Sequence, residues 1–398
     1  MFLLALLVIA GFALYVMKPD ERIRLLQWTV ANGRRVTHVA VEHAAKEDPF
    51  TEALRAKTKP PLVVPALITY NVVIFVCMLF GSGSFGDPAT LVAWGGNFGP
   101  RTTNGEWGRL LTSMFVHAGF LHLVATIAGL TQAGFIMERI VGYVTFSAVY
   151  LTAGLCASVV SLGLHPLDVN VGASGAIFGV YGFLAAMSVW GIRGQSGVVI
   201  PLQTLKAFAP AVGLFLLYNL FGGLSLAADM AGFIAGAVAG VVLAQDIGQR
   251  RPAPRRIAAT VGATFGLAAV IAIPLHGITD MRQEVQAIVR AEDVTAAKYE
   301  KAVEQFRKGA LSGHELAEVI DRTIIPELAA AGARLTGLGR VPQEHQALLA
   351  RTQDFLRLRD ESWRLRATAL AQGNMAVLRK ADEAEMSSFQ ALEEIRRY

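Results

Sequence analysis

Residues 169–180, VNVGASGAIFGV, place one serine among small residues at the point where a long apolar run begins. Gly175 and Gly179 follow Ser174 at a spacing of four, which allows transmembrane helices to approach closely. A serine here is either a nucleophile or a packing residue. The first role requires a neighbouring group that takes the proton of its hydroxyl.

The composition of the chain is that of a membrane protein. Its 398 residues are 53% hydrophobic and 17% charged, with a mean hydropathy of +0.45, whereas soluble proteins carry about 25% charged residues. Cys77 and Cys156 both lie in apolar runs, so neither a disulfide framework nor a zinc site is expected. The net charge of +5 reflects basic residues beside apolar runs, which indicates membrane topology rather than nucleic-acid binding.

The apolar runs divide the chain into five parts. We expect a membrane anchor at 1–17, a basic juxtamembrane segment at 18–61, a six-span membrane core at 62–249, a basic linker with an extra span at 250–279, and a soluble helical domain at 280–398. In the last part, charges of both signs alternate with apolar residues at helical spacing, which is typical of a helical hairpin or coiled coil that binds a partner.

The core spans are expected at roughly 62–82, 111–134, 142–164, 172–192, 200–221 and 226–246, with the extra span near 257–277. If the spans alternate, the short basic segments fall on one side, which is the cytoplasm by the positive-inside rule. These segments are 18–61, the turns at Arg139 and Arg193, and 250–256. The other side receives the 83–110 loop, the 165–170 loop and the C-terminal tail, although Arg101 and Arg109 in the first loop depart from the rule.

Polar residues in three of the spans indicate a shared site, because such residues are rare within membranes unless functional. The second span contains His117, His122 and Thr126, the fourth begins at Ser174, and the sixth contains Asp229. Gly232, Gly236 and Gly240 form a second small-residue face on the sixth span. If the two glycine faces pack together, Asp229 lies three residues, about 4.5 Å, above its stripe, at a depth similar to that of Ser174.

Three motifs, EWGRLLTSMFVHAGFLHL (106–123), GASGAIFG (172–179) and DMAGFIAG (229–236), together resemble the rhomboid family of intramembrane serine proteases. The resemblance covers about residues 62–246 and implies a six-helix, all-α core that binds a substrate's transmembrane helix and cleaves it within the membrane. It assigns the nucleophile to Ser174 and oxyanion support to His122 and His117. It also places Gly172 in the turn that helps to form the floor of the site.

Two positions depart from the family pattern. The oxyanion asparagine, four residues after the second histidine, is Thr126 here, which offers one hydroxyl donor in place of two amide donors. The general-base histidine is replaced by Asp229. A carboxyl group has a pKa near 3.9 and an imidazole near 6.5, so the aspartate is the weaker base. Burial would strengthen it, but would also favour its protonated form. Alternatively, His165 could fold over the site, or His117 or His122 could change role.

Two functions therefore remain open. One is a client-binding pseudoprotease, and the other is an intramembrane serine endopeptidase in which Ser174 attacks and Asp229 or a displaced histidine takes the proton. A transporter is disfavoured because the polar residues gather at one depth. We expect no metal or organic cofactor. The expected partners are membrane lipid, single-span membrane proteins and a protein that binds the C-terminal domain. The expected location is a bacterial inner membrane, with the site near its outer face.

Overall fold

The computed structural model describes residues 49–81, 83–193, 198–222, 226–244 and 251–397, and the side chains of 217–222 are outside that description. The predicted 1–17 anchor and most of the 18–61 segment lie outside the described residues. The described part is helical and contains no strand, only the isolated bridges Asn97–Asn170 and Ile278–Arg340. The predicted all-α polytopic fold is confirmed, with six described helices long and apolar enough to span a membrane.

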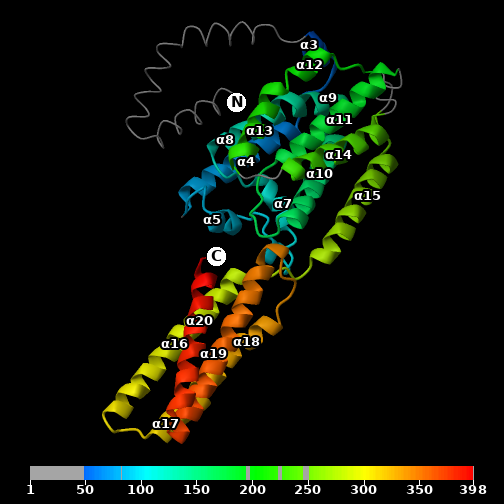
Figure 1. Cartoon of the computed structure of the whole chain (residues 1–398). Helices are drawn as coiled ribbons and strands as arrows, with labels where there is room; N and C mark the ends of the chain where they lie inside the picture. Colours follow the sequence, from blue (N-terminus) through cyan, green and yellow to red (C-terminus); the bar gives the residue numbers. More distant parts are fainter. Residues whose placement is uncertain (1–48, 82, 194–197, 223–225, 245–250, 398) are drawn as a thin grey trace, which may run out of the picture. The chain divides into compact units, whose positions relative to one another are not determined.

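The membrane unit comprises the described residues up to Phe98, then 108–165 and 169–273. Its helices pack side by side in a bundle (Figure 1). They are α3 (Pro49–Lys57), α4 (Val63–Phe80), α5 (Pro88–Ala93), α7 (Arg109–Thr112), α8 (Phe120–Gly129), a π turn (Leu130–Gly134), α9 (Phe135–Val141), α10 (Tyr143–Leu164), α11 (Ser174–Ile192), α12 (Leu202–Lys206), α13 (Ala209–Gly222), α14 (Leu226–Leu243) and α15 (Pro254–Ala272).

Helix α11 lies at the centre of this unit, between α10 and α14, and 72% of its span is buried within the protein. The span that contains α15 has a higher mean hydropathy than α11, 2.0 against 1.6, but only 6% of it is buried. The remaining apolar surface of α15 requires lipid, because contiguous apolar patches of this size are not stable in water. The bundle is therefore a solvent-excluding core around α11 with a lipid-facing periphery.

Two predicted span boundaries differ from the structure. The second span is Phe120–Val141 rather than 111–134, because Gly119, with φ of 140°, ends the irregular segment before α8. The predicted 200–221 span is divided into α12 and α13. Pro210 is the second residue of α13, and proline is tolerated at the start of a helix, where its missing N–H would have no partner.

Glu138 on α9 fixes the start of α4. Its Oε1 accepts the N–H groups of Leu62 and Val63 at 2.7 and 2.8 Å, and its Oε2 accepts the N–H of Val64 at 2.8 Å. A helix start leaves N–H groups without intrahelical partners, and a carboxylate accepts their hydrogen bonds. Its negative charge also interacts favourably with the positive end of the helix dipole. This buried carboxylate therefore joins two membrane helices.

The second unit comprises residues 99–107, 166–168 and 274–398. Its helices are α6 (Gly99–Thr102), α16 (Met281–Arg307), α17 (Gly313–Val319), a π turn (Ile320–Ile324), α18 (Ile325–Thr336), α19 (Gln346–Gln372) and α20 (Met375–Arg396). The two loop segments and the C-terminal helices thus belong to one compact unit. The N–H of Ile278 donates to the Thr103 hydroxyl at 3.0 Å, and the Asn104 amide donates to the Ile278 carbonyl at 2.9 Å.

Helices α19 and α20 form the predicted helical hairpin, with Gly373 in the left-handed conformation and Asn374 capping α20. The charges of this domain are not all solvated, however. Arg359 is 2% exposed and forms ion pairs with Glu292 of α16 at 2.6 Å and Glu385 of α20 at 2.7 Å. Its guanidinium also lies 4.3 Å from the ring centre of Trp363. Pairing of this kind is what permits burial of a charged side chain.

Candidate functional site

Ser174 is the first residue of α11, and a tight turn leads into it. Gly172 has φ of 104°, a region that glycine enters without strain, and its N–H donates to the Ser113 carbonyl at 2.8 Å. The first intrahelical bond runs from the Ile177 N–H to the Ala173 carbonyl. The N–H groups of the first turn, including that of Ser174, therefore lack helical partners, as at every helix start. Ser174 is 8% exposed at this end.

Glycines bring α11 and α14 into backbone contact next to Ser174. A methyl group at Gly232 would lie 2.0 Å from the Gly175 carbonyl oxygen, and one at Gly236 would lie 1.8 Å from the Gly179 carbonyl oxygen. Gly240 meets the backbone of Phe183 in the same way, at 2.9 Å. The predicted packing of the two glycine faces is confirmed.

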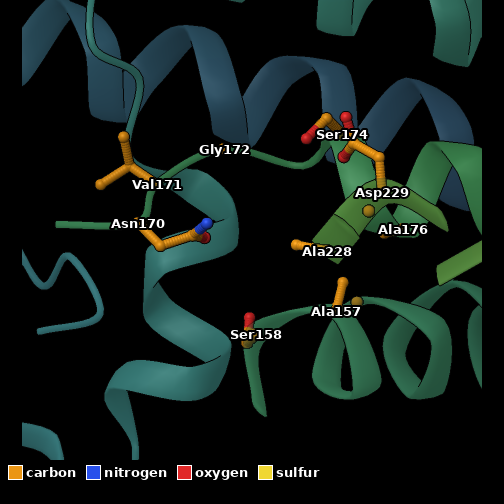
Figure 2. A pocket seen from close by; sticks show the side chains of 11 residues that line it. Ala157, Ser158, Asn170, Val171, Gly172, Ser174, Ala176, Ala228 and Asp229 are labelled. Atoms are coloured by element: carbon orange, nitrogen blue, oxygen red, sulfur yellow. The ribbon is translucent and has the colours of Figure 1, made fainter. Parts of the chain in front are cut away.

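Asp229, three residues before Gly232, is 2% exposed and lines the same pocket as Ser174. Figure 2 shows the two side chains next to each other at one end of this pocket. The pocket has room for about one water molecule. The lining residues are Gly154, Ala157, Ser158, Asn170, Val171, Gly172, Ser174, Gly175, Ala176, Ala228 and Asp229.

His122 lies beneath the turn that precedes Ser174. It is fully buried, and a methyl group at Gly172 would lie 2.2 Å from its Cε1 and 2.3 Å from its Nε2. The His117 ring packs edge-on against the His122 ring, with the centroids 5.1 Å apart. The structure therefore gathers His117, from the segment before α8, and His122, on α8, near the Ser174 turn.

Thr126 is paired with His117. The Nδ1 of His117 lies 3.2 Å from the Phe115 carbonyl oxygen, and its Nε2 lies 3.1 Å from the Thr126 hydroxyl. A carbonyl only accepts hydrogen bonds, so we assign the proton of a neutral ring to Nδ1, and Nε2 then accepts from Thr126. The single hydroxyl donor of Thr126 is thus bonded to His117, and this hydrogen bond would have to break before the hydroxyl could donate to an oxyanion.

His165 ends α10 as an exposed residue, and no histidine lines the pocket in the part of the chain that the structure describes. Of the candidate proton acceptors considered from the sequence, Asp229 alone shares the described pocket with Ser174. Nor do the described residues include three or more histidine, cysteine, aspartate or glutamate side chains grouped to hold a metal ion.

Asn170 is a pocket residue that sequence reasoning missed. Its N–H and carbonyl exchange two hydrogen bonds of 2.9 Å with the backbone of Asn97 in the preceding loop, and the Asn97 amide donates to the Ser158 carbonyl at 2.9 Å. The signal available in the sequence was an asparagine four residues before Ser174. Its side chain was not predicted to face the site because the pairing with residue 97 depends on the folded loop.

This arrangement can hold a carbonyl group beside a serine hydroxyl, a carboxylate and the N–H groups of a helix start, which is the geometry of an acyl-transfer site without an imidazole base. Residues 104–246 match the Rhomboid domain family model. The chain carries a Rhomboid domain. With its apolar helices, it is a multi-pass integral membrane protein that carries this domain at residues 104–246.

Curated relatives agree with this assignment. The chain is 34% identical over 139 residues to the rhomboid protease GluP of Bacillus subtilis, which is 35% of this chain and 27% of that protein. It is 42% identical over 80 residues to the putative rhomboid protease YdcA of the same organism, 20% of this chain and 40% of that protein. RHOMBOID-like protein 7 of Arabidopsis thaliana is 28% identical over 195 residues, 39% of this chain and 62% of that protein. The chain therefore spans less than two thirds of each of these relatives.

Proposed function

We propose that this rhomboid-family protein binds the transmembrane segments of other membrane proteins at the Ser174–Asp229 pocket and hydrolyses them very slowly or not at all. The observation that carries the proposal is the carboxylate of Asp229, which lines the pocket of Ser174 at the position where the rhomboid pattern has an imidazole. In this proposal Ser174, Asp229 and Gly172 line the client-binding pocket, His122 supports the turn at Gly172, and His117 packs against His122 with Thr126 holding it in place.

The chemical argument concerns the proton of Ser174. A serine hydroxyl attacks a carbonyl only when a base removes its proton, and the same group must then protonate the leaving amine. An aspartate carboxylate, with a reference pKa of about 3.9, is a poorer base at neutral pH than imidazole. General acid–base catalysis contributes about 10²–10⁴ in rate, and one oxyanion donor contributes about 10²–10³. Both contributions are weakened here.

An active serine endopeptidase is the second candidate, favoured by one specific observation. Asp229 lines the pocket of Ser174, and the helix start provides backbone N–H groups at the same place. An aspartate held there takes the Ser174 proton directly and returns it to the leaving amine. The two candidates differ in whether Ser174 reacts.

Labelling with a fluorophosphonate probe tests this difference in the full chain in detergent or nanodiscs. We expect no labelling above that of the Ser174→Ala variant, with both proteins giving the same melting temperature. Labelling of the wild type that Ser174→Ala abolishes would overturn the pseudoprotease proposal and support the endopeptidase.

Client binding is tested separately with a fluorescent Leu–Ala transmembrane peptide flanked by lysines, titrated into nanodiscs that contain the protein. Saturable binding that is equal for the wild type and Ser174→Ala is expected, because the hydroxyl is not needed for binding. The absence of saturable binding to the wild type would contradict the proposal.

The membrane and its orientation also belong to the proposal. If the expected spans alternate, Arg139, Arg193 and the 250–256 linker fall on one side, which supports a plasma membrane, the inner membrane of a bacterium, with the pocket near the outer face. In this proposed topology the extra span would lead to the outer side, where the C-terminal domain would recruit a protein partner. The cysteine of an Asp168→Cys variant should react with a membrane-impermeant maleimide on intact cells. Failure of that cysteine to react would contradict the proposed orientation.

A further inference from the structure

Among the polar side chains that line the described pocket, Asn170 is the only amide. The others are the carboxylate of Asp229 and the hydroxyls of Ser158 and Ser174. A carboxylate only accepts hydrogen bonds and a hydroxyl donates one, whereas an asparagine amide donates two. A main-chain carbonyl that enters the pocket therefore finds its strongest set of side-chain donors at residue 170.

The backbone of Asn170 holds this amide in place. Both backbone polar groups of Asn170 are used in the pair of 2.9 Å hydrogen bonds with Asn97, and the Asn97 amide is in turn tied to the Ser158 carbonyl at 2.9 Å. The main chain of Asn170 is therefore occupied, while its half-buried side chain reaches into the pocket, as Figure 2 shows. A donor held by a fixed backbone loses little conformational freedom when it binds.

We infer that Asn170 is a client-binding residue whose side-chain amide donates a hydrogen bond to a main-chain carbonyl of the bound transmembrane segment. The inference rests on the proposed function, because it names the group through which the same pocket holds its client. The hydroxyl of Thr126 does not offer this donor, since it is paired with His117. In a site with little water, a peptide carbonyl without a donor is destabilised, so the amide provides affinity that apolar contacts cannot.

The inference is tested with the Leu–Ala transmembrane peptide in nanodiscs and with matching peptides in which one backbone amide at a time is replaced by an ester. An ester carbonyl is a weaker acceptor. One ester position should weaken binding to the wild type. The Asn170→Ala variant should bind the all-amide peptide about 3- to 10-fold more weakly, as expected for one hydrogen bond, and should be insensitive to that ester.

Two further variants control for folding and charge. Asn170→Asp keeps the size of the side chain but removes its donors, and it should also weaken binding. Asn104→Ala removes an exposed amide whose hydrogen bonds go to the Pro100 and Ile278 carbonyls, outside the pocket, and should bind the peptide like the wild type. Equal melting temperatures of the Asn170 variants and the wild type show that only binding has changed.

The outcomes separate the two proposals. If the wild type binds the peptide and Asn170→Ala binds it equally well, the role of Asn170 is overturned and the proposed function stands. If Asn170→Ala weakens the binding of every ester peptide by the same factor as it weakens that of the all-amide peptide, the amide does not contact a main-chain carbonyl. The inference then also fails. If the wild type does not bind the peptide, the proposed function is overturned and the inference fails with it.

Discussion

The backbone of Gly236 on α14 lies against that of Gly179 on α11 so closely that a methyl group at 236 would be 1.8 Å from the Gly179 carbonyl oxygen. This contact and that of Gly232 with Gly175 set the separation of the two helices that carry Asp229 and Ser174. Any side chain at 236 must push α14 away from α11. The geometry of the pocket therefore depends on small residues outside it.

We predict that Gly236→Ala lowers the free energy of unfolding by about 1–3 kcal/mol, the usual range for overpacking a close contact. Thermal unfolding in detergent measures this loss. Gly266→Ala on α15 is the matched control, because a methyl group at Gly266 would meet nothing within 4 Å. Alanine is the better helix former, so the control should be neutral or slightly stabilising. Equal effects of the two substitutions would show that the glycine contact is not tight.

The second prediction concerns Gly172 and His122. Gly172→Ala introduces both backbone strain, at φ of 104°, and a methyl group 2.2 Å from the His122 ring. We expect a loss of about 2–4 kcal/mol in unfolding free energy. In a His122→Ala background, the ring contact is absent and Gly172→Ala should cost about 1 kcal/mol less, because only the backbone strain remains.

Gly119→Ala provides the control for strain alone. Gly119 has φ of 140°, but a methyl group there would meet nothing within 4 Å. Its cost should therefore not change in the His122→Ala background. If Gly172→Ala is likewise unaffected by His122→Ala, the proposed contact between residues 122 and 172 is wrong.

Much of the bundle was predictable from the sequence because it follows from local periodicity. Span hydropathy located the apolar helices, and the spacing of the glycines in the fourth and sixth spans predicted that Ser174 and Asp229 share one depth. Their shared pocket agrees with that expectation. Catalytic and binding roles for these residues stay predictions.

Contacts made by loops and by single polar side chains were not predictable. Asn170 faces the pocket because its backbone pairs with Asn97, far away in sequence, and Thr126 is drawn to His117 rather than toward the pocket. The burial of Arg359 also escaped prediction, because periodicity does not reveal which charge of a helix face finds two carboxylates. These features depend on tertiary structure that no local pattern records.

The third prediction addresses Glu138, which accepts three N–H groups at the start of α4. Glu138→Gln keeps the size of the side chain but loses the negative charge and one acceptor oxygen, and it should lower unfolding free energy by about 1–3 kcal/mol. Glu106→Gln, which affects the exposed ion pair with Arg101 at 2.7 Å, should change it by less than about 1 kcal/mol. Chemical denaturation of both variants measures the difference, and an equal effect would contradict the capping role.

The fourth prediction is a pH dependence of the C-terminal domain. Burial lowers the pKa of His345 below its ordinary value, and the positive charge of Arg282 adds to this, although Asp280 and Glu344 oppose it. Neutral His345 accepts the Met281 N–H at its Nδ1, at 3.3 Å. Because the folded state favours the neutral ring, the stabilising contribution of His345 to folding is complete above the unfolded pKa of about 6.5. This contribution is lost as the pH falls below that value.

Unfolding of the full chain, monitored in α16–α20 by hydrogen exchange at pH 7.5 and pH 5.5, should show reduced protection around residues 280–282 at the lower pH, after correction for the intrinsic exchange rates. His345→Gln, which stays neutral, should reduce this difference. His314 lies at the start of α17 with its side chain exposed, so His314→Gln should retain the full pH dependence. A pH effect that survives in His345→Gln would place its origin at another group.

The last prediction restores the base. Asp229→His places an imidazole on the residue that shares the pocket of Ser174. If the weak base is the main defect, fluorophosphonate labelling of Ser174 should rise by about 10²–10⁴, the usual contribution of general acid–base catalysis. The Asp229→His, Ser174→Ala double variant should not label. Asp229→Asn, which removes the charge without adding a base, should stay unreactive and so separates loss of the carboxylate from gain of an imidazole. A folded Asp229→His variant that does not label would show that the serine is also limited by something besides its base, with the occupied hydroxyl of Thr126 as the first position to change.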